Sequence, residues 1–352
     1  MSAEALEVAG WDIGGVNVKA ARLTVRAGDI VTARSHVHPF EIWRRPRQLT
    51  TVLRQVAGAL GIDDDMPMAV TMTAELSDAF RTKREGVLAV IDGVRCAFPA
   101  GSPRVLDTAG DLVTPQAARR RPLDFAATNW VASALFAAER RPDCVLVDVG
   151  STTTDIIPIR EGRIAAEGRA DVARLAAGEL VYSGVLRTNP ATLVATVPLR
   201  GRSCRVAAES FTQMADVYLL LGRLAPDDYM CSTADGRGAG REEARERLAR
   251  LVCADAETLA EEETLKLARY LAERQLRQVT DGLLQVLSRQ PDAYSLPVAP
   301  AGAGAFLAAE AGQRLGLSVL EPDEVWRGVE HVALPAGAVA ALLARRLAAG
   351  LP

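Results

Sequence analysis

Short apolar runs over residues 6–38, with alternating apolar and polar positions at Ala21, Leu23 and Val25, predict three short strands joined as a meander. The segment Ala27-Gly28-Asp29 is typical of the hairpin turn between the second and third strands. Apolar residues then recur with helical spacing over 47–60, and the helix is expected to end at Gly61. A continuous apolar run over 66–72 predicts the next strand.

The later part of the chain repeats this order. Its apolar runs predict strands over 87–91 and 104–106, a helix over 125–140 with Asp124 as N-cap, strands over 144–149, 154–159 and 163–167, helices over 241–290, a strand over 298–303, a helix over 306–315, a strand over 317–320 and a C-terminal helix. A meander followed by helices and a strand, occurring twice, indicates a duplicated α/β architecture. We expect lobe I over 1–141, with a helix over 335–350 packing back on it, and lobe II over 142–334, including the helical subregion 241–290.

Composition narrows the class of protein. A chain of 352 residues favours two domains, and 49% hydrophobic residues are enough for sizeable cores. The net charge of -3 gives no basic surface for nucleic acid, and 5% aromatic residues disfavour base stacking. We therefore expect small-molecule partners and no nucleic acid, with a homo-oligomer left open.

The cysteines and termini favour a cytoplasmic protein. The five cysteines are scattered with no C-x-x-C pair, which fits reduced thiols better than disulfides or a zinc site. The N-terminal segment MSAEALEVAG lacks the basic and apolar regions of a signal peptide. No run approaches the ~18 apolar residues of a membrane span, so no membrane partner is expected.

A strand that ends in Asp and turns at small residues occurs twice. The first copy reads Trp-Asp-Ile-Gly-Gly-Val-Asn-Val-Lys over residues 11–19. Gly14 and Gly15 allow close backbone approach, so N–H groups from Gly14 to Asn17 are expected to bind a phosphate. Asp12 is placed to hold Mg²⁺ through water, and Asn17 and Lys19 to reach phosphate oxygens. Taken alone, this loop is equally typical of a tight hairpin with structural glycines.

The second copy reads Val-Asp-Val-Gly-Ser-Thr-Thr-Thr-Asp over residues 147–155. Hydroxyl donors stand beside the backbone N–H groups here, and the phosphate-binding residues are expected to be Gly150, Ser151, Thr152 and Thr153. Asp148 is a second candidate metal carboxylate, and Asp155 either orients the loop or faces substrate. A Thr-rich hairpin is the competing interpretation, but two copies together favour two phosphate loops.

A third Gly-rich segment joins the predicted strand over 298–303 to the helix after it. Gly302 and Gly304 lie in this turn, where small residues let a ligand approach the backbone and the helix N-terminus. A lone Gly-x-Gly is also typical of an ordinary strand–helix turn.

Two acidic residues follow the strand over 66–72. Either Glu75 or Asp78 could serve as a general base, and helix capping is the competing role, for which Asp78 is well suited. The basic residues after them, including Lys83, are expected on a solvated charged face.

Two further residues are weaker candidates for substrate contacts. Arg187 could bind an anion or form a structural ion pair. Asp235 lies in the polar segment Asp235-Gly-Arg-Gly238, which is typical of a mobile loop.

Together, the two Asp-x-Gly hairpins and the late Gly-rich turn resemble the actin-like ATPase superfamily. The resemblance implies an α/β, ribonuclease H-like, duplicated two-lobe fold with a central cleft. The segment over 148–155 looks most like the hydantoinase/oxoprolinase branch. A narrower resemblance, to proteins linked to tetrahydromethanopterin-dependent one-carbon transfer and to the methanofuran-biosynthesis synthase family, rests on residues 10–20, 71–78, Asn129-Trp130 and 179–188.

The narrower resemblance implies an activity. Enzymes of that family join an (aminomethyl)furanmethyl diphosphate to a γ-glutamylated tyramine or tyrosine phenol, form an aryl ether and release pyrophosphate. Loops that grip the phosphates of ATP can equally grip a leaving pyrophosphate, and Mg²⁺ would neutralise the charge that develops there.

Two other classes of function stay open at this stage. One is a kinase or an oxoprolinase-like ATPase, which forms ADP. The other is a non-catalytic nucleotide sensor or scaffold of the one-carbon pathway, with the charged stretch 241–290 as a docking surface.

Overall fold

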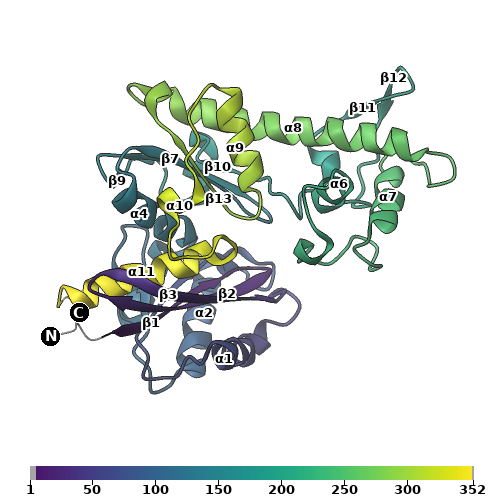
Figure 1. Cartoon of the computed structure of the whole chain (residues 1–352). Coiled ribbons are helices and arrows are strands. Elements are labelled where there is room, and N and C mark those ends of the chain that lie inside the picture. Colours follow the sequence, from purple (N-terminus) through teal and green to yellow (C-terminus); the bar gives the residue numbers. More distant parts are fainter. Residues whose placement is uncertain (1–4, 351–352) are drawn as a thin grey trace. The chain divides into compact units, whose positions relative to one another are not determined.

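A computed structural model describes residues 5–350 as a mixed α/β chain with two compact units (Figure 1). Unit 1 contains the residues up to Leu146, Ile157–Arg174 and the residues from Leu320 onward. Unit 2 contains Val147–Ile156 and Leu175–Val319. The predicted lobe I, 1–141 with the helix over 335–350, and lobe II, 142–334, differ from these units mainly in that Ile157–Arg174 belongs to unit 1.

Unit 1 is built on a six-stranded sheet of order β3-β2-β1-β4-β5-β6. Its strands are β1 (Leu6–Ile13), β2 (Asn17–Arg26), β3 (Asp29–Pro39), β4 (Met68–Met72), β5 (Arg104–Leu106) and β6 (Leu112–Val113). β1 pairs antiparallel with β2 and parallel with β4. The predicted meander is therefore confirmed, and its first strand lies inside the sheet.

The helices of unit 1 cover the sheet. They are α1 (Leu49–Leu60), α2 (Lys83–Ala97), α3 (Pro115–Arg120), α4 (Asn129–Arg140), α10 (Pro322–Val325) and α11 (Leu334–Ala348), with 3₁₀ turns η1 (Pro46–Gln48), η2 (Ala74–Leu76), η3 (Pro122–Phe125) and η7 (His331–Ala333). α1 ends as predicted at Gly61, whose φ of 64° suits glycine.

One predicted element of this part is wrong, and another begins at a different residue from the one predicted. The apolar run at 87–91 is not a strand but the middle of α2, which buries Val87, Val90 and Ile91 on one face. The helix predicted over 125–140 begins later, at Asn129 after Thr128, because residues 122–125 form the separate turn η3.

α11 is the core helix of unit 1. It packs against β1, β2 and α4, and Figure 1 shows it along the sheet. A Cβ on Gly10 of β1 would lie 2.0 Å from the carbonyl oxygen of Ala336, so glycine permits this close packing. The window His331–Ala348 is long and apolar enough to cross a membrane, contrary to the expectation from composition. Its residues are mostly buried within the protein, which accounts for the apolar sequence.

A second sheet has the order β10-β8-β7-β13, with β9 paired to β8. Its strands are β7 (Cys144–Val149), β8 (Thr154–Arg160), β9 (Arg163–Ile164), β10 (Leu180–Val181) and β13 (Val298–Ala301). The strand predicted over 317–320 is reduced to a single parallel bridge between Val319 and Val298.

The remaining elements carry the helical part of unit 2. They are α5 (Asp171–Ala177), which crosses from unit 1, the hairpin β11 (Thr196–Leu199) and β12 (Arg202–Arg205), α6 (Met214–Leu220), α7 (Arg241–Arg250), α8 (Glu261–Leu287), α9 (Ala305–Arg314) and 3₁₀ turns η4 (Pro190–Thr192), η5 (Pro226–Asp228) and η6 (Ala293–Ser295). The helices predicted over 241–290 are confirmed as α7 and α8, and α8 packs against α6, α7 and α9.

The duplication extends to the distal turns of the two meanders. The loop Ala27-Gly28 joins β2 to β3, and Glu161-Gly162 joins β8 to β9. All four residues have positive φ, which is typical of the two-residue type I′ hairpin. The two sheets therefore share both the Asp-ended strand and the turn that follows its partner.

Candidate phosphate-binding hairpins and buried carboxyl group

The first hairpin is a tight turn between β1 and β2. The N–H of Gly14 donates to the carbonyl oxygen of Asn17 at 2.9 Å and closes the turn. The carbonyls of Gly15 and Val16 accept from Ile42 and Phe40, which hold the turn from outside. These hydrogen bonds to the carbonyl groups of the turn therefore fix its backbone conformation.

The second hairpin closes in the same way between β7 and β8. The N–H of Gly150 donates to the carbonyl oxygen of Thr153 at 2.8 Å. The carbonyls of Gly150 and Ser151 accept from Val185 and Arg187 at 3.0 and 2.9 Å. The same Gly in the same position of each Asp-x-Gly motif therefore makes the same bond.

Each turn leaves two consecutive N–H groups without an acceptor among residues 5–350. They belong to Gly15 and Val16 in the first hairpin and to Ser151 and Thr152 in the second, and all four residues are half-buried. The N–H groups of Gly14 and Gly150 are used inside the turns, so the predicted donor set is smaller than the sequence indicates. Paired free N–H groups in a tight turn form a concave site for an anion.

Charged and amide groups flank the first hairpin. Asp12 is buried at the end of β1, and its carboxylate lies 3.7 Å from the ammonium of Lys19 on the paired strand. Asn17 is also buried, and its Oδ1 has no hydrogen-bond partner among the described residues. Thr73, after β4, donates its N–H to the carbonyl of Ile13 and places its hydroxyl beside Gly14.

The Gly-rich turn after β13 lies against the second hairpin. A Cβ on Gly302, which has φ of 79°, would lie 2.3 Å from Oδ1 of Asp148. Gly304 donates its N–H to the carbonyl of Val149 at 2.8 Å. Both glycines thus allow the start of α9 to approach the end of β7, and Asp148 is buried beneath it.

The side chains of the second hairpin divide between surface and interior. Ser151, Thr152 and Thr153 are half-buried, with the hydroxyls of Ser151 and Thr152 3.5 Å apart. Asp155 is buried opposite Leu180 of β10. Arg187 is exposed, and its backbone N–H is the group that bonds Ser151.

The structure separates the two candidate bases. Asp78 is exposed and does not cap α2, whose first turn is capped by Thr82 accepting from the N–H of Glu85. Glu75 lies in η2 and is only 2% exposed. The absence of a side chain on Gly86 permits this packing, because a Cβ there would lie 2.4 Å from the carbonyl oxygen of Glu75.

The surroundings of Glu75 favour its protonated form. Burial raises the pKa of Glu75 to about 7, and the carboxylate of Asp171 adds to the increase. Hydrogen bonds from its own backbone and from Ala127, together with the ammonium of Lys83, act in the opposite direction. Its Oε2 has no hydrogen-bond partner among the described residues. A carboxyl group with these properties can exchange a proton near neutral pH.

The neighbours of Glu75 were not identified from the sequence. Lys83 forms an ion pair with Asp171 rather than lying free on a solvated face. Ala127 adopts φ of 51°, which is uncommon for a residue with a Cβ. No local motif marks these residues, because they are brought together from α2, α5 and the loop before α4.

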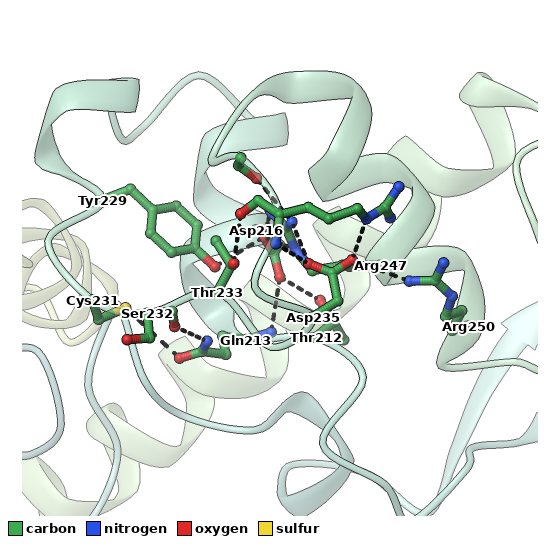
Figure 2. Close-up of polar contacts among 12 residues, drawn as sticks. Thr212, Gln213, Asp216, Tyr229, Cys231, Ser232, Thr233, Asp235, Arg247 and Arg250 are labelled. Carbon is green, nitrogen blue, oxygen red and sulfur yellow. Dashed lines mark hydrogen bonds and ion pairs between the residues drawn. The ribbon is translucent and has the colours of Figure 1, made fainter. Parts of the chain in front are cut away.

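Asp235 is held by arginines (Figure 2). Partial burial acts to raise the pKa of Asp235, but hydrogen bonds from Arg237 and Arg247 outweigh it and lower the pKa to about 2. Arg250 lies 3.3 Å away as a further ion-pair partner. The loop that was expected to be mobile is thus tied to α7, and a ligand role for Asp235 stays a prediction.

No group of three or more His, Cys, Asp or Glu side chains among residues 5–350 could enclose a metal ion. Mg²⁺ usually binds through one or two carboxylates together with substrate phosphates and water. Asp12 and Asp148, each buried beside free turn N–H groups, have the chemistry for that mode of binding.

Comparisons with known proteins agree with the α/β fold and the paired Asp-x-Gly hairpins. The chain belongs to the hydantoinase/oxoprolinase family, whose sequence profile matches residues 68–345. An acetone carboxylase, solved without nucleotide in a study of ATP-dependent acetone carboxylation, has the same fold, with a TM-score of 0.60, 12% identity and coverage of 96% of this chain and 70% of that chain. The predicted actin-like α/β fold class is confirmed.

Two relatives with higher sequence identity indicate which group of this family the chain resembles. The chain is 35% identical over 342 residues to the (4-{4-[2-(gamma-L-glutamylamino)ethyl]phenoxymethyl}furan-2-yl)methanamine synthase of Methanocaldococcus jannaschii, covering 97% of this chain and 98% of that protein. A synthase of the same name from Methanococcus vannielii is 36% identical over 126 residues, which are 36% of this chain and 56% of that protein. The predicted resemblance to the methanofuran-biosynthesis synthase family is confirmed.

Proposed function

We propose that this protein is a transferase of methanofuran-type cofactor biosynthesis. It joins an (aminomethyl)furanmethyl diphosphate to the phenol of a γ-glutamylated tyramine or tyrosine and releases pyrophosphate. The name of the archaeal relative describes a product with a phenoxymethyl link to a furan, which is the bond formed in this reaction. The observation that carries the proposal is the pair of identically closed hairpins, each with two free N–H groups beside a buried Asp.

Each hairpin is a proposed phosphate-binding element of its own unit. The free N–H groups of Gly15 and Val16, and of Ser151 and Thr152, donate to phosphate oxygens, and their fixed backbones need no rearrangement when charge develops on the leaving group. Lys19 adds a cation at the first hairpin, and the hydroxyls of the second add neutral donors. The two hairpins thus offer different donors.

Asp12 in unit 1 and Asp148 in unit 2 are each proposed as a carboxylate ligand for Mg²⁺ at their own hairpin. When bound, the ion neutralises part of the charge on the departing pyrophosphate. Asp12 already has a partial counter-charge in Lys19, so the site suits a cation that is shared with phosphate. Asp155 and Arg187 are assigned lesser roles in orienting the second hairpin and meeting an anionic group.

Glu75 is the proposed general base. The phenol oxygen attacks the furan methylene carbon while the bond from that carbon to the diphosphate oxygen breaks, and the phenolic proton moves to the carboxylate of Glu75. A pKa of about 7 makes Glu75 a stronger base than an exposed carboxylate while leaving about half of it ionised at neutral pH. Thr73 connects it to the first hairpin, two residues before it in the chain.

The test is direct assay of the reaction with furanmethyl diphosphate, γ-glutamyl-tyramine and Mg²⁺. We expect equal amounts of pyrophosphate and aryl ether, measured by a coupled phosphate assay and by mass spectrometry. Asp12→Asn should remove most of the rate, whereas Asp29→Asn, at the exposed distal turn, should not. No ether at high enzyme concentration, or ADP formed from ATP with the phenol, would exclude this function and favour a kinase or ATPase.

A further inference from the structure

A buried glutamine connects the longest helix to the second hairpin. Gln275 of α8 is fully buried, and its amide Nε2 donates to the hydroxyl of Ser183 at 2.8 Å and to the carbonyl of Gly184 at 2.9 Å. Its Oε1 accepts from the hydroxyl of Tyr218 on α6 at 2.7 Å. Both amide hydrogens are used, so the side chain has one orientation that satisfies it.

The segment that Gln275 holds, Ser183–Thr188, supports the second hairpin from behind. Val185 and Arg187 donate their N–H groups to the carbonyls of Gly150 and Ser151. The backbone carbonyl of Ser183 accepts a hydrogen bond from the hydroxyl of Thr154 at 2.7 Å. A Cβ on Gly184 would lie 2.4 Å from the backbone nitrogen of Thr152, so the segment is in direct contact with a free N–H group of the turn.

A second connection reaches the same segment through α6. The first N–H groups of this helix, from Met214 and Ala215, donate to the carbonyls of Thr188 and Leu186. The helix is itself fixed by the buried ion pair of Asp216 with Arg247 (Figure 2). The Ser183–Thr188 segment therefore has its backbone bonded on one side to the hairpin and on the other to α6 and α8.

We propose that Gln275 is a positioning residue for phosphate binding: it holds the Ser183–Thr188 segment so that the N–H groups of Ser151 and Thr152 keep the conformation that receives an anion. This inference deepens the proposed function and rests on it for the identity of the anion. The helical subregion thereby gains a role beyond covering the sheet, because it determines the rigidity of the second hairpin.

The experiment compares Gln275→Met, which keeps length and loses all three hydrogen bonds, with the wild-type protein. Hydrogen–deuterium exchange of peptides covering 147–156 is measured without ligand, and titration calorimetry measures binding of pyrophosphate with Mg²⁺. We expect faster exchange in the hairpin and a dissociation constant raised on the order of tenfold, as expected when buried hydrogen-bond partners are lost. In the proposed reaction, KM for the diphosphate should rise more than kcat falls.

Thr280→Val is the matched control. Thr280 is also buried on α8, but among the described residues its hydroxyl bonds only to the carbonyl of Leu276 in the same helix. Tyr218→Phe removes the outer bond and leaves both donors of Gln275, so a smaller change in the same direction is expected. If Gln275→Met does not fold, Ser183→Ala is used in its place, because it removes the hydrogen bond from Gln275 to the Ser183 hydroxyl.

The outcomes separate the inference from the proposed function. Unchanged exchange in the hairpin of Gln275→Met, or an equal change in Thr280→Val, overturns the positioning role. A wild-type protein that does not bind pyrophosphate overturns the diphosphate proposal, while the exchange comparison still decides whether Gln275 holds the hairpin.

Discussion

At the scale of single residues, the carboxyl group of Glu75 is costly to keep charged. Its burial raises the pKa to about 7, and one oxygen has no partner among the described residues. Such a group destabilises the folded protein when it ionises, and proteins retain this kind of group where chemistry requires it. Function and stability should therefore respond in opposite directions to its removal.

Glu75→Gln should lower the rate of ether formation by at least about 100-fold, because a general base contributes about that much. The wild-type rate should rise with pH and level off above about 7, as the carboxyl group ionises. A pH–rate profile of both proteins checks this. Asp78→Asn, at an exposed position, is the control. An equal loss of rate in that variant would assign the role of general base to Asp78.

The same substitution should stabilise the protein at neutral pH. The folded-state pKa of Glu75 lies above its ordinary value of 4.5, so between about pH 4.5 and 7 the folded chain holds a proton that the unfolded chain has lost. The free energy of unfolding of the wild type therefore falls as pH rises through this window. The free energy of unfolding of Glu75→Gln should exceed that of the wild type by up to about 3 kcal/mol at pH 8 and by little at pH 4.5. Urea unfolding at several pH values measures the difference, and a pH-independent difference would contradict it.

Gly302→Ala tests the approach of the Gly-rich turn to Asp148. The methyl group would collide with Asp148 at 2.3 Å, and φ of 79° adds backbone strain. We expect weaker pyrophosphate binding by calorimetry and destabilisation of more than about 1 kcal/mol. Gly316→Ala has a similar φ of 72° with no atom within 4 Å, so it should show the strain alone and normal binding. Equal binding defects in both variants would contradict the assignment.

At the scale of elements, a buried ion pair connects α6 and α7 in the helical part of unit 2. Asp216 on α6 and Arg247 on α7 are both fully buried and 2.7 Å apart. Asp216 also accepts from Thr212 and Tyr229, as Figure 2 shows. Removal of Asp216 leaves the buried guanidinium of Arg247 with Asp235, 3.2 Å away, as its remaining carboxylate partner among the described residues.

Asp216→Ala should therefore destabilise the protein by about 3–5 kcal/mol. Glu242→Ala, which breaks an exposed pair with Arg245 on α7, should cost less than about 1 kcal/mol. Urea unfolding followed by circular dichroism measures both. A small effect of Asp216→Ala would mean that the pair contributes no net stability to the packing of α6 on α7.

The pattern of apolar residues predicts the longer elements well and the short ones poorly. Alternating positions identify β2, helical spacing identifies α1 and α8, and a continuous apolar run identifies β7, which is buried on both faces. The run at 87–91 was assigned to a strand because five apolar or small residues in sequence fit either period, and only its extension to Val94 shows the helix. The hairpin of β11 and β12 is largely exposed and leaves no comparable pattern.

The candidate site could be predicted only where it is local in sequence. The hairpins were found because Asp, Gly and the turn residues are neighbours in the chain. Gln275 and Asp171 could not be found, because a glutamine or aspartate on a charged helix looks solvated until tertiary packing buries it or brings it beside Glu75. Glu75 and Asp78 were indistinguishable for the same reason, since only burial separates them.

At the scale of the whole molecule, the strand, turn and strand that carry the Asp-x-Gly hairpin occur twice, and the proposed anion site of each copy has different donors. The fold alone does not choose between ATP and a diphosphate substrate, because related folds carry different reactions. Binding of pyrophosphate, a product of the proposed reaction, can be compared with binding of ATP to choose between the two. A ligand that binds the folded chain at 100 times its dissociation constant raises the free energy of unfolding by about 2.7 kcal/mol.

We expect pyrophosphate with Mg²⁺ to stabilise the protein by this amount at concentrations where ATP with Mg²⁺ has little effect, because the proposed ligand has no nucleoside. Removal of Mg²⁺ by a chelator should abolish the stabilisation, since the carboxylates of Asp12 and Asp148 would then repel the phosphates. Asp148→Asn should lower the dependence on Mg²⁺, whereas Asp143→Asn, a half-exposed residue before β7 in an ion pair with Arg160, should behave as wild type. Thermal unfolding with each ligand, with and without metal, measures these effects. Greater stabilisation by ATP would contradict the proposed ligand and favour an ATP-dependent function.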